Sequence, residues 1–152
     1  SRLWSAAQRC IRDRPGQAYA VRVRGRQAQA RITGIDAEDA KAAAGVIAVY
    51  TGKDAEEAGL GTVYSPAADM LKNKDGTPIF KTTRNLIAKD RVRHVGDLVA
   101  VVVAETPAQA RDAADLVMVD YDDLPPVADT AGAVAHAAPA PREATGSNHA
   151  SP

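Results

Sequence analysis

The sequence contains few cysteines and few aromatic residues. One cysteine, Cys10, occurs among 152 residues, which excludes an internal disulfide and a metal site built from several thiolates. Such low cysteine content is also compatible with a reducing compartment. Because aromatic residues are few, the apolar 45% of the chain consists mainly of alanine and valine. These small side chains favour close packing of helices on sheets, and they provide few aromatic anchors for binding. The six aromatic residues are Trp4, Tyr19, Tyr50, Tyr64, Phe80 and Tyr121.

Long hydrophobic runs are also missing. No run approaches the ~20 apolar residues of a membrane span, and the first residues lack the apolar core of a secretory signal. We therefore expect no membrane span and a cytoplasmic location. The length suits one domain, which would bury roughly 70% of the surface of the unfolded chain.

The net charge is zero, but the charges are unevenly distributed. Residues 1–31 hold eight arginines and one acid, whereas residues 32–152 hold 11 basic and 18 acidic residues. One hypothesis is that this basic arm recruits an acidic partner. No aromatic platform or nucleic-acid motif accompanies it, so we expect no nucleic-acid partner. The arginines of this hypothesis are Arg22, Arg24, Arg26 and Arg31.

Residues 98–121 predict a strand–helix–strand unit of the type found in crossovers. The valine-rich run Leu98–Ala104 is typical of a strand covered on both faces. Thr106, followed by Pro107 and Gln109, has the pattern of a helix N-cap. The helix would present a narrow apolar face, and the next strand would end before the pair of prolines at 125–126. The face consists of Ala110, Ala113, Ala114 and Val117.

The junction between that strand and helix argues against a nucleotide site. It reads Glu105-Thr106-Pro107, with no glycine-rich loop and with a carboxylate near the place of a phosphate. Because many unrelated proteins contain such a unit, it implies no chemistry by itself.

The rest of the chain predicts further short elements. We expect a helix over Ala37–Ala44 with Asp36 as N-cap and Gly45 after its end, and a helical turn over residues 55–58. Strands are expected at residues 18–23, 28–35, 46–50 and 91–95, the first two paired through a turn near Gly25.

Residues 59–90 lack periodicity and predict a long loop with a turn at Asn73–Gly76. The expected organisation is an arginine-rich arm over residues 1–17, an α/β domain over 18–130 and a loose tail over 131–152.

No constellation of catalytic residues emerges from the sequence. His94, His136 and His149 lack metal-ligand spacing, and we interpret His94 as a partly buried strand residue. The serines lie in no nucleophile-elbow context. We interpret the acidic residues near the end of the last strand as solvated rather than as a cation site. They are Asp120, Asp122 and Asp123.

Three stretches, taken together, resemble a known domain. Gly45–Asp54 reads G-V-I-A-V-Y-T-G-K-D, Leu86–Thr106 contains the valine-rich strand, and Ala108–Val127 ends in D-Y-x-x-L-P-x-V. They resemble the N-terminal α/β hammerhead domain of the molybdopterin-binding large subunits of xanthine dehydrogenase, aldehyde oxidase and carbon monoxide dehydrogenase-like enzymes. The resemblance covers about residues 12–130. Gln29 and Gly25 stand where the family usually has histidine and serine.

The resemblance implies a mixed sheet with short helices packed on it. It also implies an oxidoreductase acting on aldehydes, N-heterocycles or carbon monoxide, with molybdenum on a pterin activating a water-derived oxygen. The pterin and the catalytic glutamate of the family lie in later domains, so we assign no catalytic, cofactor-binding or metal-binding residue here.

The implied partners are the remaining large-subunit domains, an iron–sulfur small subunit and a medium subunit that binds FAD. We expect the chain to be a fragment that is inactive alone. The alternative is a free-standing interaction module that uses the basic arm.

Overall fold

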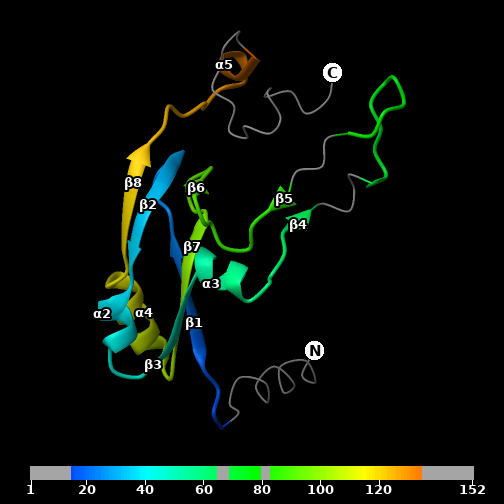
Figure 1. The fold of residues 1–152 in the computed structure, drawn as a ribbon. Helices are drawn as coiled ribbons and strands as arrows, with labels where there is room; N and C mark the ends of the chain where they lie inside the picture. The colour runs from blue at the N-terminus through cyan, green and yellow to red at the C-terminus, as the bar shows by residue number, and fades with distance from the viewer. Residues whose placement is uncertain (1–14, 65–68, 80–82, 135–152) are drawn as a thin grey trace, which may run out of the picture.

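The structure is a computed structural model that describes residues 15–64, 69–79 and 83–134. Within these ranges, short helices accompany two three-stranded sheets and a two-stranded pair (Figure 1). The helices are α2 (Glu38–Ala42), α3 (Gly52–Glu57), α4 (Pro107–Asp115) and α5 (Thr130–Val134). The strands are β1 (Tyr19–Arg24), β2 (Ala30–Asp36), β3 (Val46–Thr51), β4 (Val63–Tyr64), β5 (Thr83–Arg84), β6 (Arg91–Val92), β7 (Leu98–Ala104) and β8 (Met118–Asp123).

The two larger sheets have the orders β1-β7-β3 and β6-β2-β8. The helices and sheets together confirm the α/β class. All ladders of these two sheets are antiparallel, so the expected mixture of strand directions is wrong. The pairing is long-range: Val102, in the central strand β7, lies opposite Val21 of β1 and Val49 of β3.

The valine-rich strand β7 lies at the centre of the core. Ala100, Val102 and Ala104 have no exposed surface, and Val102 and Ala100 belong to a cluster that includes Ala113 of α4. Ala110 and Ala113 of α4 are also fully buried. Small side chains on both partners therefore let the helix lie close to the sheet.

The local details of the predicted strand–helix–strand unit are confirmed. The Thr106 hydroxyl accepts a hydrogen bond from the Gln109 backbone N–H at 3.3 Å, and Pro107 is the first helical residue. The last strand, β8, ends at Asp123, before the prolines. However, β7 and β8 belong to different sheets, so the unit is not a crossover within one sheet.

The expected hairpin between the first two strands is wrong. β1 pairs with β7, and β2 pairs with β6 and β8. The backbone N–H of Gly25 donates to the Asp97 carbonyl at 2.8 Å, and the N–H of Gly96 donates to the Gly25 carbonyl at 2.8 Å. The turn before β7 thus fastens the chain at Gly25, and the two strands diverge into separate sheets.

Helix α2 is shorter than the expected span of residues 37–44. Its N-cap residue is Ala37, although the Asp36 carboxylate still accepts a hydrogen bond from the Glu38 N–H at 3.1 Å. Gly45 has a φ of 77° but is not the predicted residue directly after the helix cap, because the helix ends at Ala42 and its C-cap is Ala43. The Gln109 side chain fills the space where a Cβ of residue 45 would stand.

The segments around α3 and β6 also differ from expectation. α3 begins at Gly52, before the expected residue 55, because the Asp54 carboxylate accepts hydrogen bonds from the N–H and the hydroxyl of Thr51, both at 2.6 Å. The strand expected at residues 91–95 ends at Val92.

The long loop contains the predicted turn, in which the Gly76 N–H donates to the Asn73 carbonyl at 2.9 Å. It also contains the paired strands β4 and β5.

The outer parts of the chain are described only in part. Residues 1–14 of the expected arm and 135–152 of the expected tail lie outside the described residues, and the first residues of that tail form α5. Among the described helices, none has the length and apolar character needed to cross a membrane.

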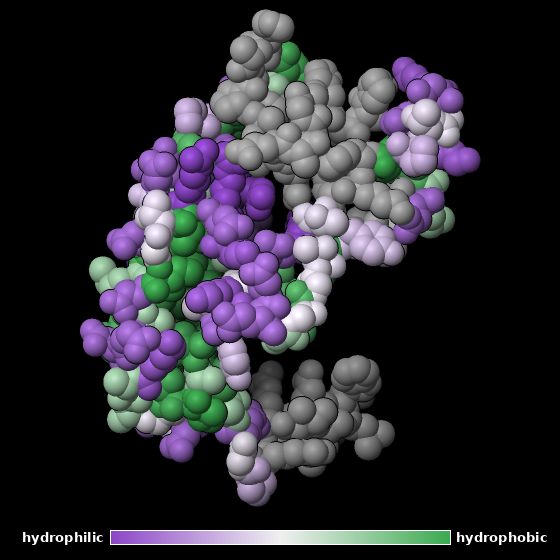
Figure 2. Space-filling view, viewed as in Figure 1, coloured by the Kyte–Doolittle hydropathy of each residue, from purple (hydrophilic) through white to green (hydrophobic). Residues whose placement is uncertain are grey.

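Figure 2 shows apolar surface between polar regions around α2 and β3. Ile47 and Tyr50 of β3 are 58% and 50% exposed.

A candidate docking groove between the sheets

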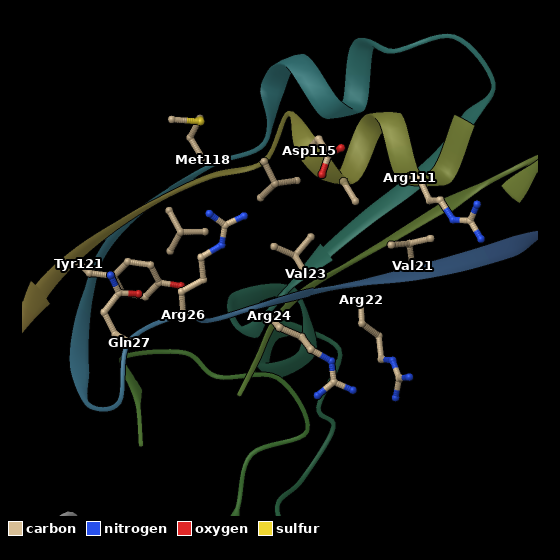
Figure 3. Close-up of a pocket in the computed structure, with 13 residues that line it drawn as sticks. Val21, Arg22, Val23, Arg24, Arg26, Gln27, Arg111, Asp115, Met118 and Tyr121 are labelled. Atoms are coloured by element: carbon tan, nitrogen blue, oxygen red, sulfur yellow. The ribbon is translucent and has the colours of Figure 1, made fainter. Parts of the chain in front are cut away.

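A groove of about 680 Å³ lies between β1 of one sheet and β8 of the other, with α4 beside it (Figure 3). Its apolar lining includes Val21 and Val23, which alternate along β1 with the exposed Arg22 and Arg24. The other lining residues are Arg26, Gln27, Arg111, Ala114, Asp115, Val117, Met118, Val119 and Tyr121.

Arginine dominates the charge of this groove. Four arginines line it against one carboxylate, Asp115. Figure 3 shows Arg26 extending into the space between β1 and β8, while Arg22 and Arg24 point to the other side of β1. Arg24 donates to the Gly96 carbonyl at 2.8 Å. In the part of the chain that the structure describes, Arg22, Arg26 and Arg111 form no ion pair.

Tyr121 lies at the β8 side of the groove and is half-buried. Burial raises the pKa of its phenol above the ordinary value of 10.0, and the negative charge of Asp97 raises that pKa further. The phenol therefore stays neutral at physiological pH, when it can donate or accept a hydrogen bond. The groove lining contains no cysteine, serine or histidine, so it offers no nucleophile with an adjacent base.

A second depression of about 270 Å³ lies at the turn before β7. It includes His94 beside Arg93 and Asp97, and the Asp97 carboxylate accepts a hydrogen bond from the Arg93 N–H at 3.0 Å. His94 is exposed and lies in the turn, so its interpretation as a partly buried strand residue is wrong. The reason is the early end of β6 at Val92.

The other candidate residues do not converge. The three aspartates of β8 are exposed, as expected for a solvated strand end. Glu56 forms an ion pair with Lys89 at 2.7 Å on the molecular surface. Cys10, His136, His149 and the serines at 1, 5, 65, 147 and 151 lie outside the described residues.

The described residues do not fit a molybdenum site. Within residues 15–64, 69–79 and 83–134, no three histidine, cysteine or carboxylate side chains come close enough to share a metal ion. The groove is lined by strand edges and arginines that point in different directions. We therefore derive no catalytic step from this chain.

The described residues thus form an α/β module of two antiparallel three-stranded sheets accompanied by short helices. Residues 12–125 match the family model described as the a/b hammerhead domain of aldehyde oxidase and xanthine dehydrogenase. The chain therefore belongs to this hammerhead-domain family, found in the large subunits of molybdenum hydroxylases.

Individual relatives agree with this assignment. The nicotine 6-hydroxylase large subunit of Paenarthrobacter nicotinovorans is 40% identical over 114 residues, covering 75% of this chain and 13% of the relative. The xanthine dehydrogenase molybdenum-binding subunit of Escherichia coli O157:H7 is 34% identical over 120 residues, covering 79% and 15%. The crystal structure of quinoline 2-oxidoreductase from Pseudomonas putida 86 is similar with a TM-score of 0.72 and 35% identity, covering 87% and 16%.

The chain thus spans about one seventh of the length of these relatives. Because the matching segment is a domain of a larger oxidoreductase chain in each of them, they do not support a free-standing module built on a basic arm.

The groove was not found from the sequence. The sequence assigns Arg26 to a basic arm, but the structure places this residue with Arg111 and Met118 and leaves Arg31 outside the groove. The alternation of valine and arginine in β1 does predict one apolar face. Only the division of β1 and β8 between two sheets shows what that face borders.

Proposed function

We propose that this chain serves as the N-terminal structural domain of a molybdenum hydroxylase large subunit. The complete enzyme would be an oxidoreductase for aldehydes, N-heterocycles or carbon monoxide. The observation that carries this proposal is the hammerhead match over residues 12–125, in a fold whose described residues form no cluster of side chains that could hold a metal ion. The role of the domain is to pack against the cofactor-binding parts of the enzyme.

The cofactors follow from the same relationship. The E. coli relative is named as a molybdenum-binding subunit. Molybdopterin would be bound outside this chain and would supply the redox chemistry, while the protein supplies placement. Iron–sulfur clusters and FAD would reside in partner subunits or domains, and the complete enzyme would work in the cytoplasm.

The surface of the domain is suited to this role. Large apolar side chains are exposed on several elements, which is typical of a surface that another protein part covers. Ile47 and Tyr50 lie on β3, and Leu116 and Met118 flank the start of β8. We place the hammerhead domain at residues 18–130, between the arm of residues 1–17 and the tail of residues 131–152.

The test is to produce the chain alone in cells that make molybdopterin. We expect no bound molybdenum and no oxidation of xanthine, nicotine or an aldehyde, because the described residues form no site for either. The E. coli xanthine dehydrogenase, assembled with its partners, is the positive control. Turnover by the isolated chain with bound molybdenum would refute a purely structural role.

A further inference from the structure

The two strands that border the groove are both edge strands. Among the strands of residues 15–64, 69–79 and 83–134, β1 has only β7 as a hydrogen-bonded neighbour, and β8 has only β2. Every second residue of an edge strand directs its N–H and C=O away from the sheet, where an added extended segment can pair with them. Residues of both edge strands line the one groove.

The floor of the groove is apolar and partly open. Val21, Val23 and Val119 line it, and Met118 at its margin is 66% exposed. An extended segment with small apolar side chains on one face would cover these residues, since side chains alternate between the faces of a strand.

The charged residues of the groove indicate which side chains the other face of such an extended segment would carry. Figure 3 shows Arg26 beside Tyr121 and Arg111 beside Val21, toward opposite ends of the groove. The lining residues Val21 to Arg24 span roughly 10 Å of strand. Guanidinium groups at opposite ends of the groove suit separate carboxylates of an extended segment. A single phosphate would require the arginines to converge.

We infer that the groove between β1 and β8 seats an extended acidic segment of the same large subunit, contributed by a part of that subunit outside the hammerhead domain. This inference rests on the proposed function. In the curated relatives the matching segment is only 13% and 15% of the chain, so the remainder of such a subunit is available to supply the occupant. Arg26 and Arg111, which line the groove against the single carboxylate of Asp115, supply the complementary charge.

Photo-crosslinking tests the inference on the protein purified through an affinity tag from the cells that naturally produce it. The crosslinker p-benzoylphenylalanine replaces Met118 in the groove or, as a control, Leu60, which is 56% exposed and lies outside the groove. We expect mass spectrometry to find Met118 crosslinked to a carboxylate-rich segment beyond the hammerhead domain, and the Leu60 position not to reach that segment.

Charge reversal provides the second measurement. Arg26→Glu combined with Arg111→Glu should lower the yield of the Met118 crosslink roughly tenfold or more. The control Arg84→Glu alters an exposed arginine outside the groove and should leave the yield unchanged. Circular dichroism confirms that each variant is folded.

The remaining outcomes contradict the inference in separate ways. Crosslinks to a second copy of this chain, to residues 135–152 or to a cofactor phosphate would overturn it while leaving the proposed function intact. The absence of any Met118 crosslink in a preparation that contains molybdenum would do the same. A preparation without a molybdenum-binding polypeptide would refute the proposed function and the inference together.

Discussion

At the scale of single residues, Gly52 lies where the start of α3 passes the chain before β6. A Cβ at this position would stand 2.6 Å from the Ala88 carbonyl oxygen and 2.7 Å from the Lys89 Cα. Both are backbone atoms, which cannot move aside as a flexible side chain can. The glycine of the T-G-K-D stretch is therefore needed for close backbone packing.

Gly52→Ala should destabilise the protein by about 1–3 kcal/mol, because overpacking against rigid backbone forces local displacement. Gly61→Ala is the matched control, since among the described residues no atom beyond the two chain neighbours lies within 4 Å of its added Cβ. Chemical denaturation of the two variants measures the difference. Equal stability of Gly52→Ala and wild type would show that the segments do not approach as described.

Asp54, two residues further along, makes stability depend on acid pH. Hydrogen bonds from the hydroxyl and the N–H of Thr51 lower the pKa of its carboxyl below the ordinary value of 3.8. A carboxyl whose pKa is lower in the folded state contributes stability above the unfolded value and loses it as the pH falls through the folded value.

Asp54→Asn should therefore cost about 0.5–1 kcal/mol at neutral pH, a small effect because the pair is close to solvent. The difference from wild type should shrink as the pH falls below 3.8 and disappear once the pH is below the lowered pKa of the folded state. The control Asp112→Asn removes an exposed carboxylate that has no hydrogen bond or ion pair among the described residues. Denaturation midpoints of the variants and wild type, measured from neutral pH to below pH 3.8, test this prediction. A difference that does not change with pH would contradict the role of the ionised Asp54 carboxylate.

At the scale of elements, α4 depends on alanines for its close contact with the sheet β1-β7-β3. Ala113 is fully buried, whereas Ala108 on the same helix is exposed. Ala113→Leu should cost about 1–3 kcal/mol by overpacking, and Ala108→Leu should change stability by less than about 0.5 kcal/mol. Urea denaturation of both variants tests this. Similar effects at the two positions would mean that the helix does not pack by this face.

The sequence predicted these elements better than it predicted their pairing. The valine run, the N-cap residue and the pair of prolines are local signals. The sequence therefore predicts β7, α4 and the end of β8. The partner of β1 depends on hydrogen bonds between Gly25 and the turn at residues 96–97, which are about 70 positions away in the chain. Local turn chemistry at Gly25 favoured a hairpin instead, and no pattern in β1 or β2 contradicts it. The groove depends on this same pairing and could not be predicted without it.

At the scale of the whole molecule, the exposed apolar residues predict how the isolated chain behaves. Without its covering partners the chain should bind a hydrophobic dye or self-associate, since an uncovered apolar surface favours both. Dye fluorescence and light scattering of the purified chain measure this. A monomer without a dye signal would contradict the idea that these surfaces are covered in the complete enzyme.

The central claim is that this chain is a structural domain of a molybdenum hydroxylase. The most direct test is the molybdenum content of the tagged protein purified from the cells that naturally produce it, together with the identity of the polypeptide that holds the metal. We predict stoichiometric molybdenum, held by large-subunit sequence outside residues 12–125. Recovery of the folded hammerhead domain without molybdenum and without such a polypeptide would contradict the account.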